Sequence, residues 1–160
     1  MTLRRSGLSL SISYAQHHPI DSWPFMSQHV LYAYVDGSDL DLLAPALEAR
    51  FAAFVSGKRW LVRDVWVVNQ RHGPETCTQP GDLPDWDLGL NLQLPKPDGE
   101  PPGWFADVEA VVQFLGELHG EFGREFVLGI ADVETGIADD MFVVSTTAPN
   151  VEELRQWLGV

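Results

Sequence analysis

Polar and apolar side chains alternate without a break from residue 85 to residue 94. The apolar set is Trp86, Leu88, Leu90, Leu92 and Leu94, and the set between them is Asp85, Asp87, Gly89, Asn91 and Gln93. Side chains two residues apart share one face of an extended chain, so this period of two predicts a β-strand with one buried face. The sheet that contains this strand must therefore expose its other face to water.

Similar reasoning predicts five more strands and three helices. The strands are expected over residues 8–14, 29–35, 60–69, 126–130 and 141–144, and the helices over residues 40–57, 104–122 and 151–158. In the first helix, Ser38 is a candidate N-cap and Asp41 follows in the first turn, whereas Pro45 should bend the helix or delay its start. Asn150 is a candidate N-cap for the last helix.

The order strand, strand, helix thus occurs three times, without a repeat in side-chain identity. Short connections between strands and helices packed on one side are typical of α+β proteins. We predict one α+β domain over residues 1–160, with the order ββα-ββα-ββα. Its largely antiparallel sheet should have about five to six strands and carry two main helices on one face.

The net charge of −13 belongs entirely to the second half of the chain. Acidic and basic residues cancel through Gly81, and from Asp82 onward sixteen acidic residues stand against Lys96, Arg124 and Arg155. Such a field repels nucleic acid and anionic membranes and attracts a basic protein. The serines that alternate with apolar residues near the N-terminus favour a strand over a signal peptide, so we expect a cytoplasmic protein. The sequence leaves its oligomeric state open.

No established catalytic motif is present: the chain has no phosphate-binding loop, no zinc-protease helix and no nucleophile elbow. Cys77 is the single cysteine, which excludes an intrachain disulfide and any multi-cysteine metal site. We therefore expect no enzyme activity, no cofactor and no metal. Five tryptophans lie in or beside periodic segments and are expected in the core, namely Trp60, Trp66, Trp86, Trp104 and Trp157.

The densest group of carboxylates lies in the segment DVETGIADD, which holds Asp132, Glu134, Asp139 and Asp140. An EF-hand reading fails, because Ala138 and Val143 stand where its seventh and twelfth ligands would fall. These residues are interpreted either as solvated turn residues or as a protein-binding patch, with metal binding or catalysis as the weaker alternative.

A different class of function would use the irregular segments at 16–28 and 71–84. They carry His17, His18, His72 and Cys77, and together they could form a pocket for a small molecule or for a small enzyme's substrate. Convergence of these side chains on one cleft would favour this alternative.

The block from Trp104 to Val144, an acidic helix followed by an acidic hairpin, resembles bacterial immunity proteins in layout and charge. The resemblance implies a protein that neutralises a cognate toxin, often a basic nuclease, by covering its active site. In that case the partner-binding carboxylates would mimic phosphates or pair with Lys and Arg of the toxin. They would be Asp107, Glu109, Asp132, Glu134, Asp139 and Asp140. The sequence leaves open whether helix and hairpin form one continuous acidic surface.

Overall fold

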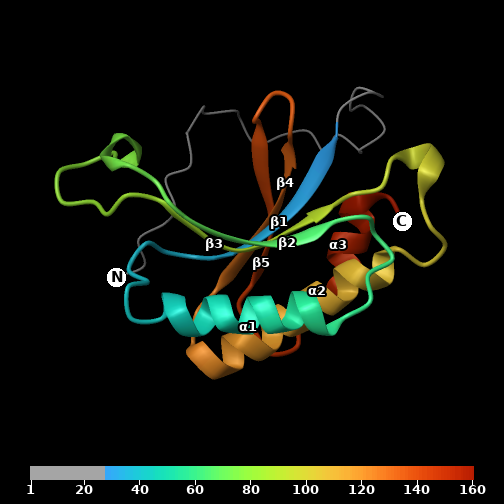
Figure 1. The fold of residues 1–160 in the computed structure, drawn as a ribbon, viewed down its shortest axis with the longest axis horizontal. Coiled ribbons are helices and arrows are strands. Elements are labelled where there is room, and N and C mark those ends of the chain that lie inside the picture. Colours follow the sequence, from blue (N-terminus) through green and yellow to red (C-terminus); the bar gives the residue numbers. More distant parts are fainter. Residues whose placement is uncertain (1–27) are drawn as a thin grey trace.

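The computed structural model describes residues 28–160 and has an antiparallel sheet packed against helices (Figure 1). The strands are β1 (His29–Val35), β2 (Val65–Arg71), β3 (Trp86–Gln93), β4 (Phe126–Asp132) and β5 (Ala138–Val144). The helices are α1 (Ala44–Gly57), α2 (Phe105–Phe122) and α3 (Val151–Leu158), with short 3-10 turns η2 (Pro74–Thr76) and η3 (Pro97–Gly99).

The five strands form one sheet in the order β2-β3-β1-β4-β5, and every neighbouring pair is antiparallel. The predicted α+β class and the antiparallel sheet are confirmed. The strand expected over residues 8–14 lies outside the described residues, so the described chain contains five strands in the order β, α, ββα, ββα. The predicted sixth strand and the first ββα unit are therefore not established.

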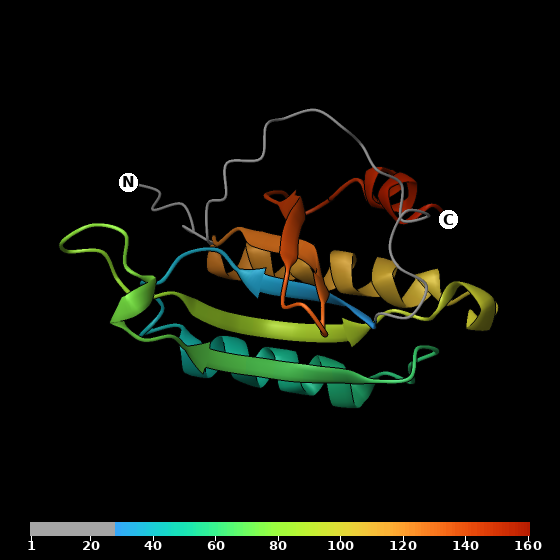
Figure 2. The same ribbon diagram turned by 90° about the horizontal axis from the view of Figure 1, so that it is seen from above.

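The two main helices, α1 and α2, lie on the same side of the sheet, as predicted, and Figure 2 shows them behind the strands. Alternate residues of each strand point to this side; in β3 these are Leu88, Leu90 and Leu92, all fully buried. They meet the apolar stripes of both helices, including Phe51 and Leu115. We call the other side of the sheet the open face, because α1 and α2 do not cover it.

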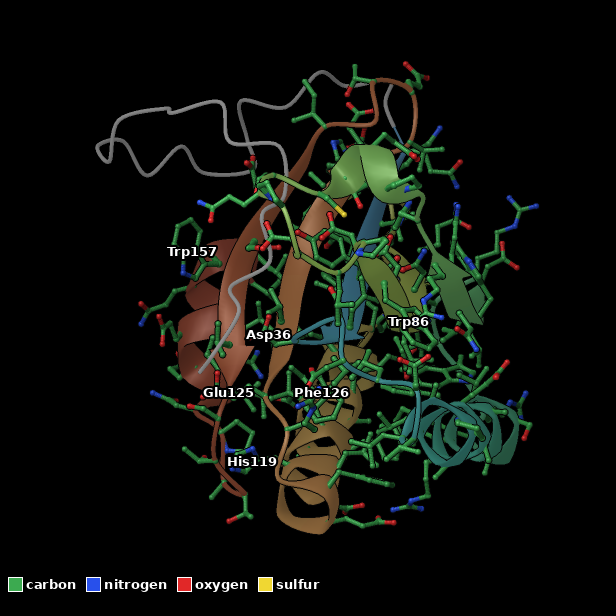
Figure 3. All side chains as sticks on the ribbon, turned by 90° about the vertical axis from the view of Figure 1, so that its left-hand side faces the viewer. Asp36, Trp86, His119, Glu125, Phe126 and Trp157 are labelled. Carbon is green, nitrogen blue, oxygen red and sulfur yellow. The ribbon has the colours of Figure 1, made fainter. Side chains whose placement is uncertain are left out.

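Figure 3 shows where three large aromatic side chains lie in the fold. Phe126 lies at the centre, between the sheet and α2, whereas Trp86 lies toward the β2 side and Trp157 lies on α3. The predicted N-cap of α3 is confirmed, since the Asn150 side chain accepts a hydrogen bond from Glu152 N at 3.1 Å. Buried Leu154 and Leu158 hold α3 to the body of the protein.

The first helix begins later than its capping pattern predicts. α1 starts at Ala44, not after Ser38, and Leu43 stands at its N-cap without a side-chain hydrogen bond. Pro45 accounts for this shift, because a proline fits the first turn of a helix, where its missing N–H is not needed. The residues before Ala44 form a turn in which Leu40 O accepts hydrogen bonds from Leu43 N and Ala44 N.

The strand predicted over residues 60–69 is also displaced, to Val65–Arg71. Residues 58–64 form the connection between α1 and β2, and their backbone is held by a side chain from α2, described below. Among residues 28–160, none of the helices combines the length and apolar composition needed to cross a lipid bilayer.

Candidate protein-binding site

Asp107 was expected on an outer acidic face of α2, but its side chain is fully buried. Its Oδ1 accepts a hydrogen bond from Lys58 Nζ at 2.8 Å. Its Oδ2 accepts hydrogen bonds from the backbone N–H groups of Leu61 at 2.7 Å and Val62 at 2.8 Å. The expectation that Asp107 faces a partner is therefore wrong: this carboxylate fixes the α1–β2 connection.

Glu109 follows Asp107 on α2 by two residues, and its side chain is half-buried. Its Oε1 is 2.5 Å from Arg155 Nη2, and the same guanidinium lies over the Phe105 ring, 4.4 Å from its centroid. The charge of Glu109 is thus balanced within the protein, where it helps to join α2 to α3.

The carboxylates of α2 and of the β4–β5 hairpin do not form one surface. α2 lies on the helical side of the sheet, whereas the hairpin tip projects from the opposite side (Figure 1). The question that the sequence left open is thus answered: helix and hairpin do not share one acidic surface. The hairpin has to be considered by itself.

The hairpin tip is ordered by Asp132, the last residue of β4. Its Oδ1 accepts hydrogen bonds from Glu134 N at 2.8 Å and Thr135 N at 3.2 Å, which is how aspartate commonly closes a turn. Gly136 has a positive φ of 71° and donates its N–H to Asp132 O at 2.9 Å. Asp132 is thus occupied inside the turn, as the solvated-turn interpretation expected of this cluster.

Apart from Asp132, the tip exposes apolar and acidic side chains together. Val133 is 57% exposed and Ile137 is 65% exposed. Glu134 and Asp139 are also exposed, and neither carboxylate forms an ion pair with another of residues 28–160. We call these four residues the hairpin tip site: Val133, Glu134, Ile137 and Asp139.

Asp140 links the hairpin to the centre of the sheet. Its Oδ1 accepts a hydrogen bond from the Tyr32 hydroxyl at 2.5 Å, and Tyr32 pairs with Gly129 across the β1–β4 ladder. A Cβ atom added at Gly129 would lie 2.1 Å from the Tyr32 hydroxyl oxygen, so the glycine provides the space in which the ring lies. Tyr32 also stacks on Tyr34, whose hydroxyl donates to Asn91 Oδ1 at 2.7 Å.

This tyrosine pair is the part of the site that sequence reasoning missed. A single signal was available, the alternation of Tyr32 and Tyr34 on one face of a predicted strand. The glycine and the carboxylate that complete the arrangement, Gly129 and Asp140, come from strands far along the chain. The hydrogen bond from Tyr32 to Asp140 thus attaches the base of the hairpin to the central strand β1.

His29, at the base of the same hairpin, carries a shifted pKa. Burial lowers the pKa of its imidazole, and the opposing attraction of Asp132 is weaker, because the closest Oδ2 is 3.9 Å from Nε2. His29 is therefore neutral in the folded protein at a pH where the unfolded chain begins to bind a proton.

We predict a pH dependence of stability from this shift. Below about pH 6.5 the unfolded state takes up the His29 proton first, so the free energy of unfolding falls until the lower pKa of the folded state is reached. The loss of stability between about pH 7 and about pH 5, measured by urea unfolding, should be smaller in His29→Gln than in the wild type. Equal losses in the two proteins would contradict this assignment.

Four residues were expected to line the alternative pocket. Two of them, His17 and His18, lie outside the described part of the chain, so His72 and Cys77 remain to be compared. His72 Nε2 lies 2.7 Å from Asp87 Oδ2, whereas Cys77 Sγ donates to Asp82 O at 3.4 Å. The two side chains thus bind different partners. Within residues 28–160, no group of three or more His, Cys, Asp and Glu side chains has an arrangement that could hold a metal ion.

The chain was compared with known proteins in three ways. Searches against protein-family models, against curated proteins and against solved structures each gave no match.

Proposed function

We propose that this chain is an acidic protein-binding module that neutralises a basic protein, as the resemblance to bacterial immunity proteins implies, and that it binds through the hairpin tip site. The partner would be a cognate toxin with a basic active site, such as a nuclease. Of the six carboxylates that the resemblance implies, Glu134 and Asp139 would contact the partner, with Asp132 and Asp140 supporting them from within.

One observation carries the proposal: two exposed apolar side chains and two carboxylates without an ion pair to any of residues 28–160 share a hairpin that contains no basic residue from Phe126 to Val144. A few side chains that are fully buried at the centre of an interface supply most of its binding energy, and surrounding charges select the partner and speed association. Val133 and Ile137 suit the first role, and Glu134 and Asp139 suit the second.

The internal bracing of the hairpin supports the same function. The Asp132 turn and the Tyr32–Asp140 hydrogen bond hold the tip before any partner arrives. A preformed binding element loses less conformational entropy on association than a flexible one, which favours tight binding.

The test compares capture of a partner by two charge-matched variants. Tagged wild type is incubated with cytosol of the source organism, and bound proteins are identified by mass spectrometry. We expect a basic protein whose retention is lost with Glu134→Gln/Asp139→Asn, because the charges facing it are gone. Its catalytic activity, assayed after isolation, should be inhibited by the wild-type chain at equimolar amounts.

The control variant is Glu117→Gln/Glu153→Gln, which removes two exposed carboxylates from α2 and α3 and so gives the same net charge. It should retain the partner like the wild type. Equal losses in both variants would mean that net charge alone matters. Retention by both, or capture of no basic protein, would overturn the proposal.

A further inference from the structure

We propose that the outer edge of β2 binds β2 of a second copy of this chain, antiparallel and about a two-fold axis, so that two five-stranded sheets join into one. This interface lies at the opposite edge of the sheet from β5 and is independent of the hairpin tip site.

The backbone of β2 supplies the first argument. Gln93 N donates to Asp64 O at 2.9 Å, and His72 N donates to Asp85 O at 2.7 Å, so the even-numbered residues of this segment direct their backbone groups toward β3. The odd-numbered residues direct theirs outward, and these are Val65, Val67, Asn69 and Arg71. Within residues 28–160, no strand pairs with that side of β2.

The two edges of the sheet differ in how they are protected. β5 has an irregular register opposite Leu128 and Gly129, and it carries two consecutive carboxylates, Asp139 and Asp140. Both features discourage the addition of another strand. β2 pairs with β3 in an unbroken register and begins with four apolar residues, Val65–Val68. An edge of this kind, without bulge, proline or central charge, is a template for strand pairing.

Trp66 marks this edge. The sequence pattern predicted it in the core, which is wrong: it is 41% exposed on the open face, opposite Asn91. On the helical side of the sheet, α1 lies next to β2. Asn69 of β2 donates a hydrogen bond to Glu48 Oε2 of α1 at 2.8 Å, so the surface of α1 around Glu48 is the part closest to this edge. One turn to either side of Glu48 stand the exposed small residues Pro45 and Ala52, which would leave room for a neighbouring helix.

Charge decides how two copies of this edge can pair. Residues 58–71 carry four basic side chains and one acidic one, so two copies fit together only in an orientation that brings basic groups near acidic ones. An antiparallel pair centred on Val68 keeps the outward backbone groups of both strands opposite each other and places Asp64 across from His72 of the second copy. It also brings the Arg63 end of one β2 toward the Glu75 end of the other. A parallel pair would instead put Arg63 beside Arg63.

Sedimentation velocity of the full chain tests the proposal. The wild type should form a dimer, and Trp66→Lys should weaken dimerisation by about a hundredfold, because a charge then stands at the centre of the new sheet. The matched control is Val143→Lys on β5, where the side chain is 51% exposed and the dimer should persist. Far-UV circular dichroism verifies that both variants are folded. A wild type that is monomeric at about 100 μM overturns the proposal, as does equal dissociation of both variants.

Charge reversal tests the orientation without altering the strand. Arg63→Glu alone and Glu75→Arg alone should each weaken the dimer by about tenfold, because like charges then meet at both ends of the interface. The double variant should restore wild-type dimerisation, since each reversed residue again faces its opposite charge. Additive losses in the double variant would overturn the antiparallel pairing.

Discussion

Asp107→Asn should reduce the free energy of unfolding by about 3 kcal/mol, because it removes the charge of a fully buried carboxylate that accepts three hydrogen bonds. The amide nitrogen of asparagine would face either the Lys58 ammonium group or the N–H groups of Leu61 and Val62, and each of these needs an acceptor. Breaking a buried ion pair also leaves the remaining charge poorly compensated.

The matched control is Glu109→Gln on the same helix. Glu109 pairs with Arg155 where both side chains are partly exposed, and ion pairs in such positions contribute about 1 kcal/mol or less. Thermal unfolding should show a melting temperature about 10 °C lower for Asp107→Asn and a small change for Glu109→Gln. Similar shifts in the two variants would mean that Asp107 is not a structural residue.

Gly89→Ala should destabilise the protein by about 3 kcal/mol or more, or prevent its folding. A Cβ atom at this position would lie 1.9 Å from the backbone oxygen of Ala33, in the central strand β1. Neither strand can move away without loss of ladder hydrogen bonds, since β3 and β1 both have neighbours on two sides.

The sign of this effect is informative, because alanine normally stabilises a strand relative to glycine by about 0.5–1 kcal/mol. Gly99→Ala serves as the control, since no atom lies within 4 Å of the position its Cβ would take. Urea unfolding of both variants measures the difference. A Gly89→Ala protein as stable as the control would show that β1 and β3 do not approach so closely.

The parts of the fold that could be predicted depend on neighbours in sequence. The alternation from Trp86 to Gln93 and the apolar stripe of α2 indicated their elements to within a residue or two. The start of α1 was misplaced because Ser38 and Asp41 suit a capping position locally, whereas the first turn forms at Pro45. Such competition between two local signals is not resolved by the pattern itself.

The candidate site was predicted only in part, because burial depends on distant residues. Asp107 lies outside the apolar stripe of its helix, yet it is buried because Lys58 and the α1–β2 connection pack over it from more than 40 residues away. Trp66 has the apolar pattern of a core residue, but its exposure follows from the position of β2 at the edge of the sheet. The hairpin itself was predicted, since its turn residues and its strands are contiguous.

The central position of β1 also determines when the protein can fold during synthesis. β1 ends at Val35, but one of its two partners, β4, begins at Phe126, about 90 residues later. At about 5–20 residues per second, the ribosome needs several seconds to produce this partner. The apolar strand Val30–Val35 must stay unaggregated during that time, and the sheet is completed only after β4 and β5 have been synthesised.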